Sequence, residues 1–248
     1  MVAVGCGCGC GYGDCHQILL LRRLSMGCIL KLDEDLDNRV TIGAVLLAAG
    51  SGSRMGHRPK SLLELDGVPL ICRQLIALSG AGVDEVVVVL GHYADRIEEA
   101  VKEFPVTLLR NSNPDAGQVS SLRLGLQALS SKLDAVLIAL ADQPLISSQD
   151  ISDLISAYKK RPQDTLVVQP SVEGLPGNPV IFSNEVRQQI LLGDATVGCR
   201  QWQSANPSQV HPWVSSNNNY RTDVDTMEDI AALAARTGHQ LKWPASQR

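Results

Sequence analysis

The sequence predicts an α/β fold, with a single Rossmann-like, mostly parallel sheet and helices on both of its faces. Short apolar runs such as 85–90 (EVVVVL) and 134–141 (DAVLIALA) are typical of strands buried in a parallel sheet. Segments with apolar residues at i, i+4 and i+7 alternate with these runs, as expected for helices packed on a sheet. This strand–helix alternation favours parallel strands joined by helical crossovers.

Each expected element has a local reason. The expected strands are short apolar runs, and they lie at residues 45–47, 85–90, 106–109, 134–141, 165–169, within 174–182, and weakly at 210–214. The expected helices carry one apolar face, and they lie at residues 69–80, 93–104, 120–129, 151–158, 184–192 and 227–235. A tight turn is expected at Asp66-Gly67, and glycines at positions 80 and 82 end the first helix.

Composition narrows the functional class. The chain has 248 residues, 44% hydrophobic content and a formal net charge of −4. Such a length suits one large domain, and the charge provides no basic field for nucleic acid. No apolar run approaches the roughly 18 residues of a membrane span. Residues 18–21 are apolar, but two arginines follow them, which reverses the order of a signal peptide. We therefore expect a cytoplasmic protein that binds neither nucleic acid nor membranes.

The domain organisation follows from the same patterns. Residues 1–40 show no sustained period, and we expect them to be a glycine- and cysteine-rich, polar leader that is disordered. The alternative is that the part before Met26 lies upstream of a true start at that residue. Its CGCGCGYGDC run lacks the C-x₂-C spacing of zinc ribbons, which disfavours a metal site there. Residues 41–238 are expected to form the catalytic domain, and residues 239–248 a tail.

The most informative stretch is 44–60, AVLLAAGSGSRMGHRPK. A glycine-rich loop after a strand allows backbone N–H groups to close on a phosphate. Arg54 and Lys60 add a guanidinium fork and a mobile charge for phosphate oxygens. The stretch contains neither the P-loop motif nor the GxGxxG dinucleotide fingerprint. It predicts binding of a polyphosphate, with a purely structural turn as the alternative.

Acidic residues complete the predicted site. Asp142 stands at the exit of a buried strand, beside a proline, and is the best candidate ligand for Mg²⁺. Asp225 is the second candidate, with Asp223 in reserve, and helix or turn capping is the alternative role for these carboxylates. The loops 48–60 and 110–118 and Asp142 all follow predicted strands. Because ligands sit at the carboxyl ends of parallel strands, we expect these loops to converge.

Several motifs that occur in a fixed order along the chain resemble those of a known family. The motifs are LAAGSGSRMGHRPK (47–60), NPDAGQVSSLRLGL (113–126), ADQP (141–144), GLPGNPVIF (174–182) and DVDTMEDI (223–230). Together they resemble the molybdenum cofactor cytidylyltransferase branch of the MobA-like nucleotidyltransferases, which have the nucleotide-diphospho-sugar transferase type of fold. The resemblance implies an enzyme that moves CMP from CTP to the terminal phosphate of Mo-molybdopterin. Pyrophosphate and molybdopterin cytosine dinucleotide would be the products, and a molybdenum hydroxylase would receive the dinucleotide.

The resemblance also implies residue roles. Arg54, Lys60 and Asp142 would be catalytic, and Asp142 and Asp225 would hold Mg²⁺. The nucleotide would be bound by Leu47, Ala48, Ala49, Gly50, Gly52, Arg54, Lys60 and Asp115. The acceptor would be bound by Gln118, Ser120, Ser121, Gly177, Asn178 and Pro179. Two departures stand out, since many members of this branch have histidine in place of Asn178 and proline in place of Met227.

Rival functions stay open at this stage. Relatives that use GTP tend to carry LAGG where this chain has LAAG at 47–50, which favours CTP. A guanylyltransferase of the same fold remains an alternative, as does a cytidylyl- or uridylyltransferase acting on a sugar or polyol phosphate. A protein of a different class, a non-catalytic molybdenum cofactor carrier, would not need Arg54, Lys60, Asp142 and Asp225 together.

Overall fold

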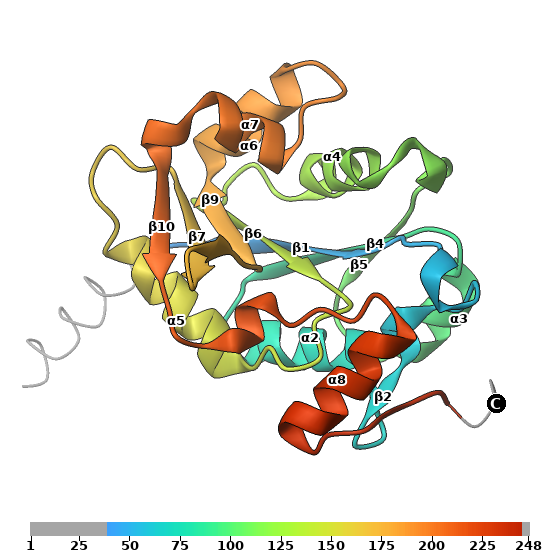
Figure 1. Ribbon diagram of the computed structural model, residues 1–248. Coiled ribbons are helices and arrows are strands. Elements are labelled where there is room, and N and C mark those ends of the chain that lie inside the picture. The colour runs from blue at the N-terminus through green and yellow to red at the C-terminus, as the bar shows by residue number, and fades with distance from the viewer. Residues whose placement is uncertain (1–38, 245–248) are drawn as a thin grey trace, which may run out of the picture. The chain divides into compact units, whose positions relative to one another are not determined.

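The computed structural model describes residues 39–244, which form the α/β arrangement of Figure 1. Within this range the strands build an eight-stranded sheet and a three-stranded sheet. The larger sheet has the order β10-β7-β9-β6-β1-β4-β5, with β8 paired to β7. Its strands are β1 (Ile42–Ala48), β4 (Glu85–Leu90), β5 (Thr107–Arg110), β6 (Ala135–Leu140), β7 (Val167–Val172), β8 (Leu175–Pro176), β9 (Val180–Ser183) and β10 (Val210–Val214).

Parallel pairing dominates the centre of this sheet. β1 pairs in parallel with β4 and β6, β4 pairs with β5, and β7 pairs with β10. β9 runs antiparallel between β6 and β7. Because β1, β4 and β6 share one direction, their carboxyl ends lie at the same edge of the sheet. The predicted fold class, a mostly parallel Rossmann-like sheet, is confirmed.

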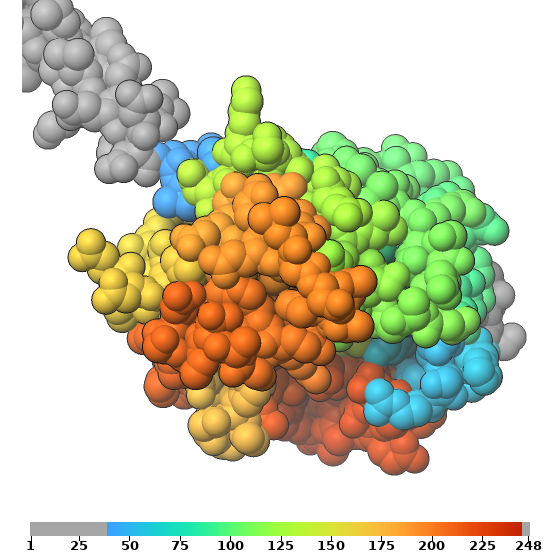
Figure 2. All heavy atoms as spheres, turned by 90° about the horizontal axis from the view of Figure 1, so that it is seen from above, coloured from blue at the N-terminus to red at the C-terminus, as the bar shows by residue number. Residues whose placement is uncertain are grey.

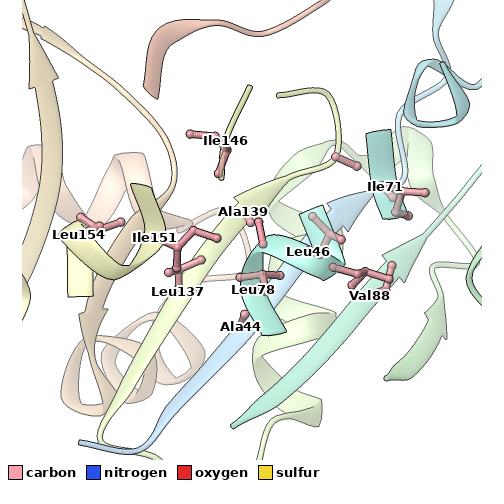
Figure 3. Close-up of a cluster of buried hydrophobic side chains, with 14 of the residues drawn as sticks. Ala44, Leu46, Ile71, Leu78, Val88, Leu137, Ala139, Ile146, Ile151 and Leu154 are labelled. Carbon is pink, nitrogen blue, oxygen red and sulfur yellow. The ribbon is translucent and has the colours of Figure 1, made fainter. Parts of the chain in front are cut away.

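Helices cover both faces of the sheet, as the sequence predicts. On one face, α2 (Leu70–Gly80), α3 (Ala94–Val101) and α5 (Ser148–Lys159) pack on alternate β1 side chains such as Leu46. Figure 3 shows this core, where Ile71 and Leu78 of α2 lie with Leu137 and Val88 of the strands.

The opposite face is covered by α4 (Gln118–Ala128), α6 (Asn184–Leu192) and α7 (Cys199–Ala205). Gly125 lets α4 approach the sheet closely, since a Cβ there would lie 2.4 Å from Val45 Cγ1. Arg123 of α4 donates hydrogen bonds to main-chain carbonyls at the end of α6, such as that of Leu191 at 3.0 Å. Figure 2 views this face, with the α6–α7 segment beside α4.

A third cluster joins the smaller sheet to the last helix, α8 (Met227–Thr237). β2 (Glu64–Leu65) and β3 (Val68–Pro69) form a hairpin whose turn residues Asp66 and Gly67 both have positive φ. This is the expected tight turn at that dipeptide. β11 (Leu241–Lys242) pairs with β2, so part of the expected tail lies in this sheet.

Some boundaries differ from the sequence expectation. The 120–129 helix begins two residues earlier, at Gln118, and the 165–169 strand instead covers Val167–Val172. No pattern in the sequence predicts α7. The leader (1–38) and its cysteines lie outside the described residues. None of the helices in the described range has the length and apolar character to cross a membrane.

Candidate active site

The glycine-rich loop after β1 follows a path that glycine permits. Gly52 has φ +59°, and a Cβ at this position would lie 2.0 Å from the Arg58 carbonyl oxygen. The one-turn 3-10 helix η1 (Ser53–Met55) begins directly after it. From the far side of the loop, Tyr93 Oη donates to the Ser51 carbonyl at 2.7 Å. The loop is therefore fixed at both its glycine turn and its start.

Four charged side chains from three segments of the chain meet at the carboxyl edge of the sheet. Lys60 Nζ donates to Asp142 Oδ2 and, at 2.5 Å, to Asp225 Oδ1. Arg54 Nη2 donates to Asp225 Oδ2 at 2.7 Å. The Lys60 and Asp142 side chains are 21% and 17% exposed, whereas Arg54 is 66% exposed. Lys60 is thus the enclosed centre of the cluster, and Arg54 lies at its rim.

Asp225 is available to this cluster because other residues cap the following helix. Thr226 Oγ1 accepts from the Asp229 N–H, and the Asp229 carboxylate accepts from the Thr226 N–H, which forms a capping box. Capping was the alternative role for this acidic stretch. The capping box is formed by Thr226 and Asp229, while the Asp225 carboxylate faces Lys60 and Arg54.

The cluster sets the charge state of its members. Burial opposes the charge of Lys60, but the Asp142 and Asp225 carboxylates outweigh it and raise the Lys60 pKa. Burial likewise opposes the charge of Asp225, but Lys60 and Arg54 lower the pKa of that carboxyl. For Asp223, burial and then the neighbouring carboxylates raise the pKa. Lys60 and Asp225 are therefore a charged pair at neutral pH.

Asp142 and Asp225 also suit a hard divalent cation. Asp142 Oδ1 is buried and has no hydrogen-bond partner in the described structure. Between residues 39 and 244, no group of three or more His, Cys, Asp or Glu side chains is placed to hold a metal ion. Mg²⁺ typically takes one or two carboxylates and completes its shell with water and substrate phosphates. Two carboxylates, one with a free oxygen, fit that pattern.

A cavity of about 230 Å³ lies beside this cluster. Loops after β1 and β6 and the start of α4 form its walls. Its lining residues are Leu47, Ala48, Ala49, Gly50, Pro59, Lys60, Ser61, Pro114, Gly117, Gln118, Ser121, Leu140, Ala141 and Asp142. The three loops that the sequence predicted to converge thus contribute to one cavity. We call it the nucleotide cavity, after the ligand that the sequence predicts for the loop after β1.

A second, larger cavity of about 640 Å³ adjoins the first, since Leu47, Gln118 and Leu140 line both. We call it the distal cavity. Its remaining walls come from α4, β6, β7, the β8–β9 segment and α7. Its polar lining side chains are Gln118, Gln169, Asn178, Cys199, Arg200, Gln201, Gln203 and Ser204. No motif in the sequence predicted that the α7 residues line a cavity, because contacts between distant segments bring them there.

The residues predicted to bind the acceptor do not all line the same cavity. Gln118 lines both cavities, Ser121 lines the nucleotide cavity and Asn178 lines the distal cavity. Ser120 lies instead in a groove on the outer side of α4. Gly177 and Pro179 flank Asn178 and are buried, and neither is among the side chains that line the two cavities.

Asp115 and Arg54 lie at the periphery. The Asp115 side chain is 83% exposed, lies 3.2 Å from His92 Nε2, and is not in the cavity lining, although Pro114 and Gly117 on either side are. Arg54 contacts Asp225 in the charged cluster, and Gly52 lies in the loop before it. Neither residue lines the cavity. A nucleotide role for Asp115 thus stays a prediction.

A glycine-rich loop, an enclosed lysine and paired carboxylates at the carboxyl edge of a parallel sheet are features of a nucleotide-handling α/β protein. Residues 44–210, more than half of the chain, match the family described as the MobA-like NTP transferase domain. The chain belongs to this family of nucleotidyltransferases.

Individual relatives differ in how much of the chain they match. The chain is 30% identical over 200 residues to Nicotine blue oxidoreductase from Paenarthrobacter nicotinovorans, covering 77% of this chain and 96% of that protein. It is 31% identical over 126 residues to Bifunctional protein GlmU from Acetivibrio thermocellus, covering 50% of this chain and only 27% of that protein. The chain thus spans about a quarter of that GlmU.

A solved structure supports the same fold. It is a nucleotidyl transferase from Methanothermobacter thermautotroptrophicus, 28% identical, with a TM-score of 0.65. The match covers 79% of this chain and 97% of that one.

Proposed function

We propose that the chain transfers CMP from CTP to the terminal phosphate of Mo-molybdopterin, in the cytoplasm, and releases pyrophosphate. The observation that supports this best is Lys60, held between Asp142 and Asp225 at the wall of the nucleotide cavity. It puts a cation suited to phosphate and two carboxylates beside the loop that resembles a nucleotide signature. The product would be molybdopterin cytosine dinucleotide, received by a molybdenum hydroxylase.

The nucleotide would occupy the nucleotide cavity. Leu47, Ala48, Ala49 and Gly50 line it, so their backbone groups are available to a base or ribose. The preference for CTP rests on the resemblance at Ala49, where GTP-using relatives tend to have glycine. Lys60 and Arg54 would neutralise the triphosphate, the first from inside the cluster and the second from its rim.

The reaction would need positioning and charge neutralisation more than proton transfer. An acceptor phosphate is already ionised at neutral pH, so no strong general base is required. Asp142 and Asp225 would hold Mg²⁺, which when bound neutralises charge on phosphate oxygens. Lys60 and Arg54 would stabilise the charge that develops as pyrophosphate leaves, and the cavity walls would align the reacting phosphates.

The distal cavity would hold the acceptor. It adjoins the nucleotide cavity along Leu47, Gln118 and Leu140, so a molecule in it could bring a phosphate to the α-phosphorus of a nucleotide. Its amide-rich lining suits a heterocycle with many hydrogen-bonding atoms, and Arg200 is its cationic side chain.

An assay of pyrophosphate release tests the proposal. CTP, GTP, ATP and UTP are each supplied with Mg²⁺ and Mo-molybdopterin, and we expect release with CTP. Asp142→Asn should lose most of this activity, whereas the matched control Asp153→Asn, at an exposed position on α5, should keep it. Release with GTP alone would favour a guanylyltransferase.

Further arms of the assay address the other rivals. Activity only with a sugar or polyol phosphate would move the acceptor to that class. Binding of Mo-molybdopterin with no pyrophosphate from any nucleotide would favour a carrier. A relative named an oxidoreductase covers most of the chain, so nucleotide-dependent reduction without pyrophosphate release is the outcome that would favour redox chemistry.

A further inference from the structure

One buried amide connects the catalytic loop to the wall of the distal cavity. Gln143 follows Asp142 directly and is 1% exposed. Its Nε2 donates to two main-chain carbonyls, those of Asn178 and Tyr220, each at 3.2 Å. Asn178 lines the distal cavity, and Tyr220 lies in the segment that leads to Asp225. A single side chain therefore contacts both the Asn178 loop and the segment that leads to Asp225.

The main chain forms the rest of this junction. The Asn178 N–H donates to the Tyr220 carbonyl at 2.8 Å, and the Val224 N–H donates to the Asp142 carbonyl at 3.0 Å. The two loops are thus bonded to each other and to the catalytic loop. Gln143 is the side chain that links both of these loops to the residue after Asp142.

The chemistry of the position requires a donor with two hydrogens. The glutamine amide supplies two N–H groups, and both acceptors here are carbonyls. Gln143 Oε1, by contrast, is buried without a hydrogen-bond partner among the described residues. Leaving an acceptor unsatisfied costs stability, and a methionine of similar shape would avoid that cost. Packing alone therefore does not account for glutamine, whereas its Nε2 bonds do.

We propose that Gln143 is a positioning residue, which holds the Asn178 loop in register with Asp142 and so sets the affinity for the acceptor. The kinetic part of this inference rests on the proposed function. The nucleotide cavity is walled by the loop after β1, by the start of α4 and by residues 140–142. The Gln143 amide donates to Asn178 and Tyr220, and neither of these residues lines that cavity. Loss of the amide should therefore affect the acceptor and spare CTP.

The chain offers a matched control in Gln74. Its side chain is fully buried, its Nε2 donates to the Gln143 carbonyl at 2.5 Å, and its Oε1 is also without a partner in the described range. Gln74→Met thus removes a comparable buried amide without touching either loop. Any effect shared by Gln74→Met and Gln143→Met comes from the loss of a buried amide or from the main chain at Gln143, and not from the two bonds that Gln143 Nε2 donates.

The experiment combines hydrogen exchange with steady-state kinetics. In Gln143→Met, amide exchange should accelerate about tenfold in residues 174–182 and 218–225 and stay unchanged in 44–60. The KM for Mo-molybdopterin should rise about tenfold, while the KM for CTP stays within roughly twofold. Gln143→Asn, which keeps both donors on a shorter side chain, should shift in the same direction by less.

Two results would overturn the inference. One is exchange that is unchanged in the two loops, or accelerated equally in Gln74→Met. The other is a parallel rise of both KM values. If the wild type releases no pyrophosphate, the proposed function fails, and the exchange pattern alone then decides the role of Gln143. Should Gln143→Met not fold, the Gln143→Asn comparison decides by the same two measurements.

Discussion

Lys60→Met is expected to tighten metal binding by the free protein while removing activity. In the structure the Lys60 ammonium lies between Asp142 and Asp225, the two carboxylates that would receive a divalent cation. A metal entering the free site must therefore displace the lysine or share its ligands. When a nucleotide binds, its phosphates offer Lys60 alternative partners. Wild-type protein should accordingly bind metal weakly alone and more strongly with nucleotide.

The size of the expected gain in metal affinity can be worked out from the charges around Lys60. Two unit charges 4 Å apart interact by about 4 kcal/mol at an effective dielectric near 20. The Lys60, Asp142 and Asp225 side chains are 21%, 17% and 28% exposed, so water screens part of this interaction. We expect removal of the lysine to make the free energy of metal binding more favourable by roughly 1.4–2.8 kcal/mol, which lowers the Kd for the metal tenfold to a hundredfold.

Electron paramagnetic resonance of free Mn²⁺ measures this Kd with and without CTP. Lys60→Met should bind Mn²⁺ more tightly than the wild type in the absence of CTP, and should lose about a hundredfold or more in turnover. Lys102→Met is the matched control, because Lys102 pairs with Glu99 on the surface of the protein. An unchanged or weaker Mn²⁺ affinity in Lys60→Met would show that Lys60 does not compete with the metal for the two carboxylates.

The remaining predictions concern stability. Gly52→Ala should cost at least twice the roughly 1 kcal/mol expected for Gly56→Ala in denaturant unfolding. Both residues have positive φ, but a Cβ meets nothing within 4 Å at Gly56 and the Arg58 carbonyl oxygen at 2.0 Å at Gly52. Because the folded protein lowers the Asp225 pKa below 3.8, that carboxylate adds stability above about pH 4 and loses it as the pH falls further. The stability gap between wild type and Asp225→Asn should close below that pH in urea titrations, and a constant gap would contradict the linkage. Arg187→Met should cost about 3 kcal/mol, because the buried guanidinium donates to three main-chain carbonyls at the end of α4, and a melting temperature within a degree of wild type would contradict this.

The centre of the fold could be predicted because its signals are local. β1, β4 and β6 are apolar runs bounded by polar turns, and the intervening helices show their apolar faces in the sequence. Right-handed crossovers and parallel pairing then leave the loops after these strands at one edge. The meeting of Lys60 with Asp142 follows from that arrangement and did not require the resemblance.

The distal cavity could not be predicted in the same way. The run at β9 shows that a strand forms, but nothing in it indicates that the strand runs antiparallel between β6 and β7. α7 is one short helix held to the rest by contacts such as Trp202 Nε1 to Gln189 Oε1 at 2.8 Å. Two-residue strands such as β11 form only because a partner is present. Such features depend on pairings between distant segments, which the local pattern does not record.

The most direct test of the account is to follow the two ends of the triphosphate. CTP labelled at the α-phosphate, and separately at the γ-phosphate, is incubated with the protein, Mg²⁺ and Mo-molybdopterin. We predict that the α-label enters the acceptor product and the γ-label leaves as pyrophosphate. A γ-label recovered in the acceptor or as free phosphate, with the α-label left in CDP, would contradict nucleotidyl transfer at this site.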